Sequence, residues 1–331
     1  MRPARNATWL VLTLLTTACA APAPRAAEVP DAGDSVAPIA PLTTRPGRAP
    51  VAVALGDAVC ARGDLAHDAC RHERVAALID SVAPDVVLML GDLQYEEGTL
   101  SAFRLQYEPS FGRFKSITRP VPGNHEYFTT SARGYFDYFN GTGQEHGIAG
   151  ARKRGFYSFE LGRWHVVAIN SNCEAVGGCG AGSAQERWLR DDLVQHPAAC
   201  TLAYWHHARF SSGLHGDDPR LDAIWQVLVD ARADLIVTAH DHDYERFAPQ
   251  DAFGGLDSAA GIRSFVVGTG GKNQRGWAVI RPNSEIRRND TFGLLRLTLD
   301  SAQYDWRFVD AATQRTVDEG VGRCRGRLAE R

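Results

Sequence analysis

Several apolar runs typical of buried β-strands are each followed by polar residues of the kinds that bind metal ions. The apolar runs are 51–55, 86–90, 120–122, 201–204 and 235–239. The polar groups behind them are, in chain order, Gly56-Asp57, Gly91-Asp92, Gly123-Asn124-His125-Glu126, His206-His207 and His240-Asp241-His242. In open α/β folds, ligands bind at the edge where the carboxyl ends of successive strands meet. The recurrence of these groups therefore predicts one shared site at that edge.

From about residue 51 onward, β-type runs alternate with helical patterns. Besides the runs above, we expect strands at 155–161 and 164–170 and helices at 71–83, 99–115, 183–195 and 219–232. After residue 260 the pattern changes to short strands at 263–267, 276–280, 292–299, 303–309 and 314–318. The runs 292–299 and 303–309 are typical of an antiparallel hairpin. Alternating β/α units that close in antiparallel strands predict an α/β fold of two packed sheets with helices outside.

The N-terminus has the order of an export signal. Arg2 and Arg5 precede the apolar run 9–15, and the small residues 18–20 follow it. That run is too short to span a bilayer, which takes ~20 apolar residues. Residues 1–20 are therefore predicted to be a signal peptide. We expect the protein to be exported, whether it is periplasmic, a lipoprotein of the cell surface or secreted.

Two interpretations of the end of this signal stay open. Residues 16–19 resemble a lipoprotein box, in which Cys19 would carry a lipid and anchor the protein to a membrane. Ala18-Cys19-Ala20 also fits ordinary signal peptidase cleavage. Residues 21–50 are rich in Ala and Pro with few apolar anchors, so they are predicted to form a disordered tether or a plain spacer. The folded domain would then occupy residues 51–331.

The cysteine count indicates disulfides. Excluding Cys19, six cysteines remain, and an even count in an exported chain is typical of a disulfide framework. Six cysteines allow fifteen pairings. Sequence proximity favours the pairs Cys60–Cys70 and Cys173–Cys179, which leaves Cys200–Cys324. A thiolate metal site is the alternative, but no Cys-x-x-Cys spacing supports it.

The charge balance argues against a nucleic-acid partner. The chain carries 36 Lys and Arg against 39 Asp and Glu, a formal net charge of −3. Proteins that bind nucleic acids show a basic patch or stripe, and no basic run stands out here. No nucleic-acid partner is therefore predicted.

The polar groups and one tyrosine supply seven side chains that can bind metal through oxygen or nitrogen. They are Asp57, Asp92, Tyr95, Asn124, His206, His240 and His242. This number suits two metal ions that share one bridging carboxylate and leave positions for water and substrate. The glycines at 56, 91 and 123 are expected to let the backbone turn sharply where each strand meets its loop.

The order of these motifs resembles that of the calcineurin-like metallophosphoesterases. It runs Gly-Asp, Gly-Asp-x-x-Tyr, Gly-Asn-His-Glu, a strand ending in His, and His-x-His, between residues 56 and 246. Tyr95, the segment Tyr244-Glu245-Arg246 and the segment 268–271 resemble the purple acid phosphatase branch. The resemblance implies a four-layer αββα sandwich of two mixed sheets flanked by helices. It also implies that residues 51–331 form the catalytic domain.

The resemblance assigns the ligands to two ions. The first ion would be bound by Asp57, Tyr95 and His242. The second would be bound by Asn124, His206 and His240, and Asp92 would bridge the two. A phenol normally titrates near ~10, so binding as phenolate implies a strongly acidic ion, most simply Fe(III). The second ion would be divalent Fe, Zn or Mn.

The function implied by the resemblance is hydrolysis of a small phosphate ester, most simply a phosphomonoester, by hydroxide generated from metal-bound water. His125 would contact the phosphate or protonate the leaving group, and His215 would also reach the substrate. A phosphodiesterase with the same site is one alternative. A non-catalytic metal-binding surface protein is another, and it predicts loss of a ligand or of His125, which this chain does not show. We expect the aromatic stretch 135–139 to pack in the core and Arg246 to form a buried ion pair.

Overall fold

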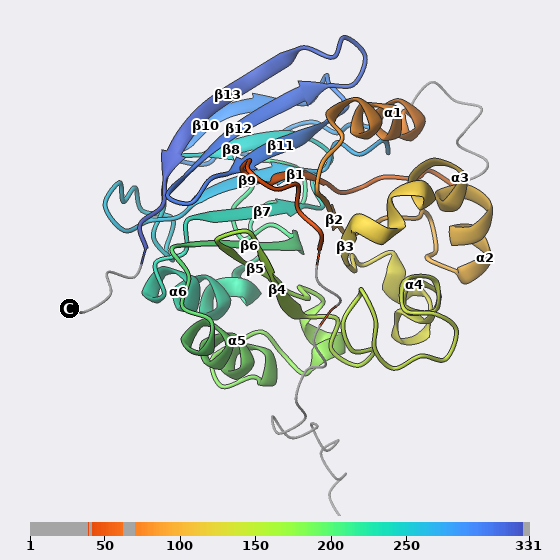
Figure 1. Ribbon diagram of the computed structural model, residues 1–331, viewed down its shortest axis with the longest axis horizontal. Helices are drawn as coiled ribbons and strands as arrows, with labels where there is room; N and C mark the ends of the chain where they lie inside the picture. The colour runs from red at the N-terminus through yellow and green to blue at the C-terminus, as the bar shows by residue number, and fades with distance from the viewer. Residues whose placement is uncertain (1–38, 40–41, 62–69, 327–331) are drawn as a thin grey trace, which may run out of the picture. The chain divides into compact units, whose positions relative to one another are not determined.

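The computed structural model describes residues 39, 42–61 and 70–326. The predicted signal peptide with Cys19 and most of the predicted tether lie outside the described residues. In the described part of the chain, two mixed β-sheets pack face to face with helices on their outer faces (Figure 1). The expected four-layer αββα fold is therefore confirmed.

The first sheet combines three parallel strands with an antiparallel extension. Its strands, in sheet order, are β13 (Thr316–Arg323), β12 (Gln303–Asp310), β11 (Gly293–Leu299), β1 (Val51–Leu55), β2 (Val86–Leu90) and β3 (Thr118–Val121). β1 pairs in parallel with β2, and β2 with β3, whereas β11 runs antiparallel to β1. β11 and β12 form the predicted antiparallel hairpin, with Leu297 opposite Trp306.

The second sheet has seven strands. They are, in sheet order, β10 (Ser284–Arg288), β8 (Tyr244–Phe247), β9 (Arg263–Val267), β7 (Leu235–Ala239), β6 (Cys200–His207), β5 (Trp164–Ala168) and β4 (Tyr157–Leu161). The strands β5, β6, β7 and β9 run parallel to one another. The carboxyl ends of β6 and β7 carry the predicted histidines.

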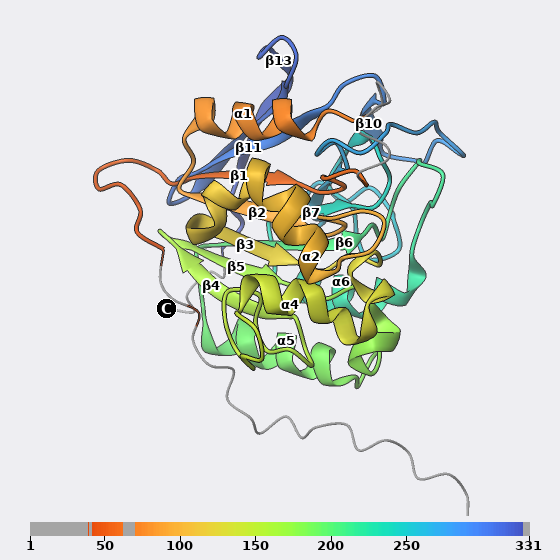
Figure 2. The same cartoon turned by 90° about the vertical axis from the view of Figure 1, so that its right-hand side faces the viewer.

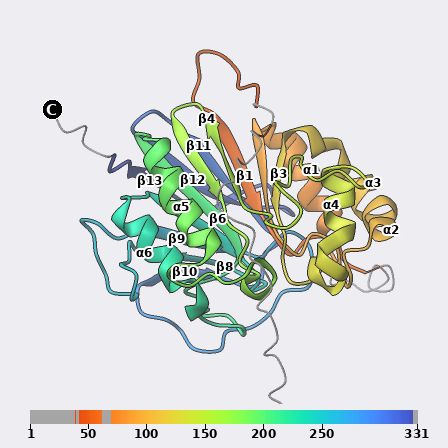
Figure 3. The same ribbon diagram turned by 90° about the horizontal axis from the view of Figure 1, so that it is seen from below.

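The helices cover the outer faces of the two sheets. On the first sheet lie α1 (His72–Val82), α2 (Leu100–Ala102), α3 (Glu108–Phe111) and α4 (Arg133–Phe139), and Figure 2 shows α1 beside β11 and β1. On the second sheet lie α5 (Ala184–Gln195) and α6 (Asp222–Asp230), side by side in Figure 3. The apolar stripe of α1 buries Val75, Leu78 and Ile79, and the helix ends at Ala83 in the left-handed conformation, directly before a proline.

The apolar runs are continuous because each central strand is buried on both faces. In β1, Ala52 and Ala54 face the core between the sheets, while Val53 and Leu55 face the helices of the first sheet. The aromatic stretch 135–139 packs in that helix-covered layer, as expected. In the described residues, no helix is both long and apolar enough to cross a membrane.

Among the described residues three disulfides form, and they are the expected pairs. Cys60–Cys70, Cys173–Cys179 and Cys200–Cys324 have Cα–Cα distances of 6.2, 5.2 and 5.2 Å. The last pair ties the end of β13 to the start of β6. It therefore links the C-terminal part of the first sheet to the second sheet.

Some element predictions were wrong. The run 276–280 is not a strand: Val279 and Ile280 are exposed, and Trp277 makes only an isolated bridge to Gly213. The short strands β8 and β10 were not predicted. The helical pattern at 99–115 is divided by a π-helical turn, Phe103–Tyr107, between α2 and α3.

Candidate metal centre

The loops behind β1, β2 and β7 turn through residues that are not glycine. Asp57, Asp92 and His240 have φ values of 56°, 49° and 73°, which lie in the left-handed region. That conformation costs free energy for residues with a Cβ and is concentrated at functional sites. Here it occurs at three of the seven predicted ligands. The backbone thus turns each of these side chains into the space between the two sheets' carboxyl edges.

The glycines next to these residues mainly allow other parts of the protein to lie close to the backbone. The expectation that all three would form the turn was therefore wrong for two of them. Only Gly91 among them has a positive φ, of 87°. A Cβ on Gly56 would lie 2.5 Å from the Cβ of Ala239, and one on Gly123 would lie 2.1 Å from Asp92 Oδ1. These two positions therefore need glycine because neighbouring side chains lie against the backbone there.

Three side chains converge on the phenol oxygen of Tyr95. Tyr95 Oη is 2.7 Å from Asp57 Oδ1, 3.2 Å from Asp92 Oδ2 and 3.1 Å from His242 Nε2. His242 Nε2 is in turn 3.3 Å from Asp57 Oδ1. Ligand atoms around one metal ion lie at such separations. The structure thus brings together the residues predicted for the first ion.

A second cluster forms around His206. Its Nε2 is 3.2 Å from Asn124 Oδ1, 3.1 Å from His240 Nδ1 and 3.3 Å from Asp92 Oδ2. These are the residues predicted for the second ion. Asp92 Oδ2 contacts both clusters.

Two of the histidines are oriented by backbone carbonyls. His206 Nδ1 lies 2.8 Å from the carbonyl oxygen of Leu90, and His242 Nδ1 lies 2.6 Å from that of Asn273. A carbonyl only accepts a hydrogen bond, so each ring carries its hydrogen on Nδ1. In the neutral ring, each Nε2 then presents a lone pair to the cluster, as a metal-binding imidazole does.

Glu126 holds two of the loops together. Its buried carboxylate accepts hydrogen bonds from the backbone N–H groups of Gly123, Asp92 and Leu93 at 2.7, 2.9 and 2.9 Å. Because these donors belong to the loops behind β2 and β3, Glu126 sets the distance between them. Glu126 thus orients the loops that carry two of the predicted ligands.

The electrostatics of the clusters fit bound cations. Asp57 and Asp92 are 0% and 2% exposed, and their carboxylates contact the side chains of Tyr95, His206 and His242. Burial opposes ionisation of Asp92, but the charges of His206 and His125 outweigh it and lower its pKa. Burial likewise disfavours the charged His206 ring, yet Asp92 and Asp57 raise its pKa to about 9. Burial and the two carboxylates raise the pKa of Tyr95 far above its usual value. Two metal ions would supply the positive charge that these acidic side chains lack.

The two predicted substrate-facing histidines lie nearer the solvent than the clusters. The His125 ring lies 4.3 Å from the Tyr95 ring, tilted by 55°, and donates from Nδ1 to the carbonyl oxygen of Glu96 at 2.6 Å. Its Nε2 lies 3.8 Å from Asp92 Oδ2. His215 is exposed, and its ring stacks on His240 with centroids 4.0 Å apart. Both rings therefore border the space above the clusters.

A model of one protein family matches the chain over the motifs described. The model is that of the Calcineurin-like phosphoesterase, and it matches residues 56–244, more than half of the chain. The chain belongs to the calcineurin-like phosphoesterase family. Within the curated proteins, Purple acid phosphatase 22 of Arabidopsis thaliana is 26% identical over 257 residues, covering 69% of this chain and 54% of that protein.

Solved structures with the same fold include two that match most of this chain. The purple acid phosphatase PPD1 from yellow lupin seeds matches with a TM-score of 0.67 at 18% identity, covering 84% of this chain and 54% of that one. GAP50 of Plasmodium matches with a TM-score of 0.60 at 12% identity, covering 85% and 90%. At these identities the matches show the fold alone. The chain spans about half the length of the purple acid phosphatases that it matches.

One flank of the phosphoesterase centre is formed by His207 and the Cys173–Cys179 loop. The His207 ring lies 4.4 Å from that of His240, and its Nδ1 lies 2.8 Å from Ser171 Oγ. Burial and the neighbouring His206 lower the pKa of His207 to about 3. His207 thus packs as a neutral ring behind a predicted ligand.

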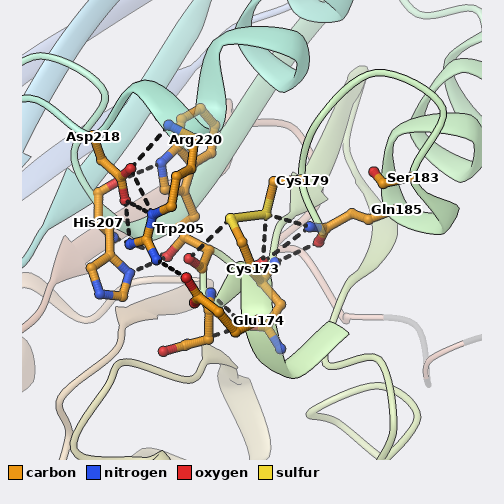
Figure 4. Close-up of a disulfide and its surroundings, with 12 residues drawn as sticks. Cys173, Glu174, Cys179, Ser183, Gln185, Trp205, His207, Asp218 and Arg220 are labelled. Atoms are coloured by element: carbon orange, nitrogen blue, oxygen red, sulfur yellow. Dashed lines mark hydrogen bonds and ion pairs between the residues drawn. A yellow bond between two sulfur atoms is a disulfide. The ribbon is translucent and has the colours of Figure 1, made fainter. Parts of the chain in front are cut away.

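Beyond His207, Figure 4 shows Arg220 between two carboxylates, near the disulfide. Arg220 pairs with Asp218 and with Glu174, each at 2.7 Å. A cavity of ≈ 580 Å³ opens here beside the glycine-rich segment 177–182. Because two acids match the single guanidinium, this flank presents no net positive charge to an anionic ligand.

Two basic residues that no sequence motif singled out lie next to the centre. Lys272 Nζ pairs with Glu96 at 2.5 Å, and it lies 4.8 Å from the centroid of the Tyr95 ring. Arg275 Nη1 donates to His215 Nε2. The available signal was a pair of basic residues directly after the segment 268–271. The expected ion pair of Arg246 forms with Asp318 at 2.8 Å, so it joins β8 to β13 of the other sheet.

Proposed function

We propose that this protein is a dimetal phosphoester hydrolase of the purple acid phosphatase type that acts on phosphomonoesters. The observation that carries the proposal is the position of Asp92 Oδ2, 3.2 Å from Tyr95 Oη and 3.3 Å from His206 Nε2. One buried carboxylate oxygen between two clusters of ligand atoms is the arrangement that a pair of bridged metal ions requires.

Each cluster would hold one ion. Asp57, Tyr95 and His242 would bind the first, Asn124, His206 and His240 the second, and Asp92 both. The first ion would be Fe(III), because only a strongly acidic ion offsets the burial and the two carboxylates that raise the pKa of Tyr95. The second ion would be divalent Fe, Zn or Mn, all of which accept imidazole and amide oxygen.

The two ions would supply a polarised phosphate and an activated water molecule. The protein's own residues account for the other steps. His125 keeps its Nδ1 hydrogen bonded to the Glu96 carbonyl, so its Nε2 faces the centre. In its protonated form this nitrogen can donate to the leaving oxygen of the ester. His215 lies on the far side of His240 and can donate to a phosphate oxygen.

A comparison of two substrates tests the proposal. The wild type and His125→Gln are assayed with p-nitrophenyl phosphate and with bis(p-nitrophenyl) phosphate across a range of pH, after the metal content has been measured. The proposal expects faster turnover of the monoester and a loss of roughly a hundredfold in kcat for His125→Gln, the usual contribution of a general acid. Faster turnover of the diester would keep the dimetal site and make the protein a phosphodiesterase. Inactivity on both with metals bound would favour a non-catalytic metal-binding protein.

We also propose that the protein acts outside the cytoplasm. Three disulfides support an oxidising compartment, since such bonds are rare where thiols are kept reduced. Cys19 would either carry a lipid anchor or lie at a cleavage site. Mass spectrometry of the mature N-terminus tests this, because an acylated Cys19 and a free terminus differ in mass by the attached lipid.

A further inference from the structure

Phe128 carries an exposed aromatic ring that contacts one of the predicted catalytic histidines. The residue is 61% exposed, and its ring centroid lies 4.7 Å from that of His125, at an interplanar angle of 59°. Single exposed apolar residues are common on protein surfaces, so the exposure by itself indicates nothing. The contact with His125 gives it meaning, because in the proposed mechanism His125 protonates the leaving oxygen. Phe128 therefore lies next to the place where the leaving group departs.

Among the described residues, two aromatic rings of other residue types lie beside His125, and the ring of Phe128 is the one that is open to solvent. The Tyr95 ring, 4.3 Å away, belongs to the first metal-binding cluster and is 2% exposed. The exposed fraction rises from 2% for Asp92 to 15% for the side chain of His125 and 61% for Phe128. His125 contacts both of these neighbours, since its Nε2 lies 3.8 Å from Asp92 Oδ2. A leaving group that accepts a proton from His125 and extends toward solvent therefore meets Phe128.

The turn that carries Phe128 also carries His125, and its backbone is held by hydrogen bonds. The N–H of Phe128 donates to the carbonyl oxygen of His125 at 3.4 Å. Thr129 donates to the carbonyl oxygen of Glu126 from its N–H at 3.3 Å and from its Oγ1 at 2.9 Å. The side chain of Glu126 in turn joins this turn to the loop behind β2. The backbone of Phe128 is thus fixed relative to His125 before a substrate binds.

The two charged side chains on this side of His125 balance each other. Glu96 Oε2 lies 3.6 Å from His125 Nδ1, and Glu96 Oε1 pairs with Lys272 Nζ at 2.5 Å. Because one carboxylate matches one ammonium group, the pair offers no net positive charge to a leaving group that is itself an anion. The aromatic ring and the neutral pair together suit an uncharged leaving group.

We propose that Phe128 binds the leaving group of the substrate against its ring, so that the preferred substrates are phosphomonoesters of uncharged aromatic alcohols. This proposal rests on the proposed function. Two aromatic rings in an offset-stacked or edge-to-face arrangement attract each other beyond the gain from the apolar area that they bury. A saturated group of the same size gains the area but lacks that additional attraction. Phe128 thus selects among substrates, while the reaction itself takes place at the metal ions and His125.

Three phosphomonoesters test the proposal. Benzyl phosphate and cyclohexylmethyl phosphate have leaving alcohols of similar size and acidity, of which only the first is aromatic, and ethyl phosphate lacks the ring. The ratio kcat/KM is measured for each ester with metal-loaded wild type, Phe128→Ala, Phe128→Leu and Phe253→Ala. The control Phe253→Ala removes a phenyl ring that is 83% exposed on the separate loop between β8 and β9.

The expected changes follow from the loss of one aromatic contact. For Phe128→Ala, we expect the preference for benzyl phosphate over ethyl phosphate to fall about threefold to tenfold. Phe128→Leu keeps an apolar side chain, so we expect it to lose the preference for benzyl phosphate over cyclohexylmethyl phosphate and to remain a folded comparison if the alanine variant is unstable. For Phe253→Ala, we expect the wild-type preferences.

Equilibrium binding gives a second readout that does not depend on turnover. Benzylphosphonate and methylphosphonate are not hydrolysed, and isothermal titration measures the dissociation constant of each. We expect Phe128→Ala to weaken the binding of benzylphosphonate by the same threefold to tenfold and to leave that of methylphosphonate unchanged.

Three results would overturn the proposal: unchanged preferences in Phe128→Ala, the same loss in Phe253→Ala, or an equal loss in Phe128→Ala for benzyl and ethyl phosphate. The last result would show that Phe128 acts only by positioning His125. If the wild type binds metals but hydrolyses neither benzyl phosphate nor p-nitrophenyl phosphate, the proposed function itself fails. If it hydrolyses both and the preferences are unchanged in Phe128→Ala, only the role of Phe128 fails.

Discussion

The buried ring of His165 makes a pH-dependent contribution to stability that can be measured far from the metal centre. His165 lies on β5, is 0% exposed, and contacts a carboxylate at each nitrogen. Nδ1 is 2.7 Å from Glu160 Oε1 on β4, and Nε2 is 2.7 Å from Asp192 Oδ2 on α5. Burial disfavours the charged ring, but the hydrogen bonds to Asp192 and Glu160 outweigh it and raise the pKa to about 9.

The size and sign of the effect follow from the difference between the folded and unfolded pKa. The pKa of the ring is 6.5 in the unfolded chain and about 9 in the folded protein. Each pH unit of that gap corresponds to about 1.4 kcal/mol, so the charged ring stabilises the fold by about 3 kcal/mol. Because the folded pKa is the higher one, this stabilisation is fully present below pH 6.5 and is lost as the pH rises through about 9.

Urea denaturation of the wild type and His165→Gln measures this contribution, with His146→Gln as a control at an exposed position. We expect the gap in the free energy of unfolding between wild type and His165→Gln to shrink by about 3 kcal/mol from about pH 6 to about pH 10. The control should track the wild type throughout. A gap for His165→Gln that stays constant over this range would refute the reasoning, because the ring would then not be charged in the folded protein.

Three further effects are expected. Gly123→Ala would place a methyl group 2.1 Å from Asp92 Oδ1, so the bridging carboxylate must move and the metal content per chain, measured by mass spectrometry of the elements, should fall. Replacing Cys200 and Cys324 together by serine should lower the free energy of unfolding by about 5 kcal/mol, since the bond closes a separation of 124 residues. Calorimetry would check this, and a loss below about 1 kcal/mol would contradict the loop-entropy argument. Removing metals with a chelator should lower the melting temperature, because ions that bind only the folded state stabilise it. An unchanged melting temperature would count against tightly bound ions.

Much of the fold could be predicted because the central strands are buried on both faces. Runs such as Val51–Leu55 and Val86–Leu90 stand out as continuous apolar segments, and the predicted ligands follow them directly. The edge strand β10 could not be recognised in this way. Its residues Ser284–Arg288 are partly exposed, so they show no apolar run. The opposite error occurred at 276–280, where exposed apolar residues imitate a strand.

The candidate site was predictable where the ligand follows its strand, and unpredictable where the partner comes from a distant loop. Asp92 can be recognised in the sequence because a glycine and an apolar strand directly precede it. For Arg275 the sequence offers only its place shortly after the segment 268–271, because His215, the residue it contacts, lies 60 positions away in the chain. The role of Gly123 was likewise misjudged, because only the folded chain shows that Asp92 occupies the space of a Cβ.

The most direct test of the account is the metal content of the purified protein and of Asp92→Ala. Asp92 Oδ2 contacts both clusters, so its loss should weaken both sites at once. We predict about two metal ions per chain in the wild type, as a bridged pair requires, and almost none in Asp92→Ala. Retention of about two ions by Asp92→Ala would contradict the account, as would a wild type that binds one ion or fewer when metals are supplied.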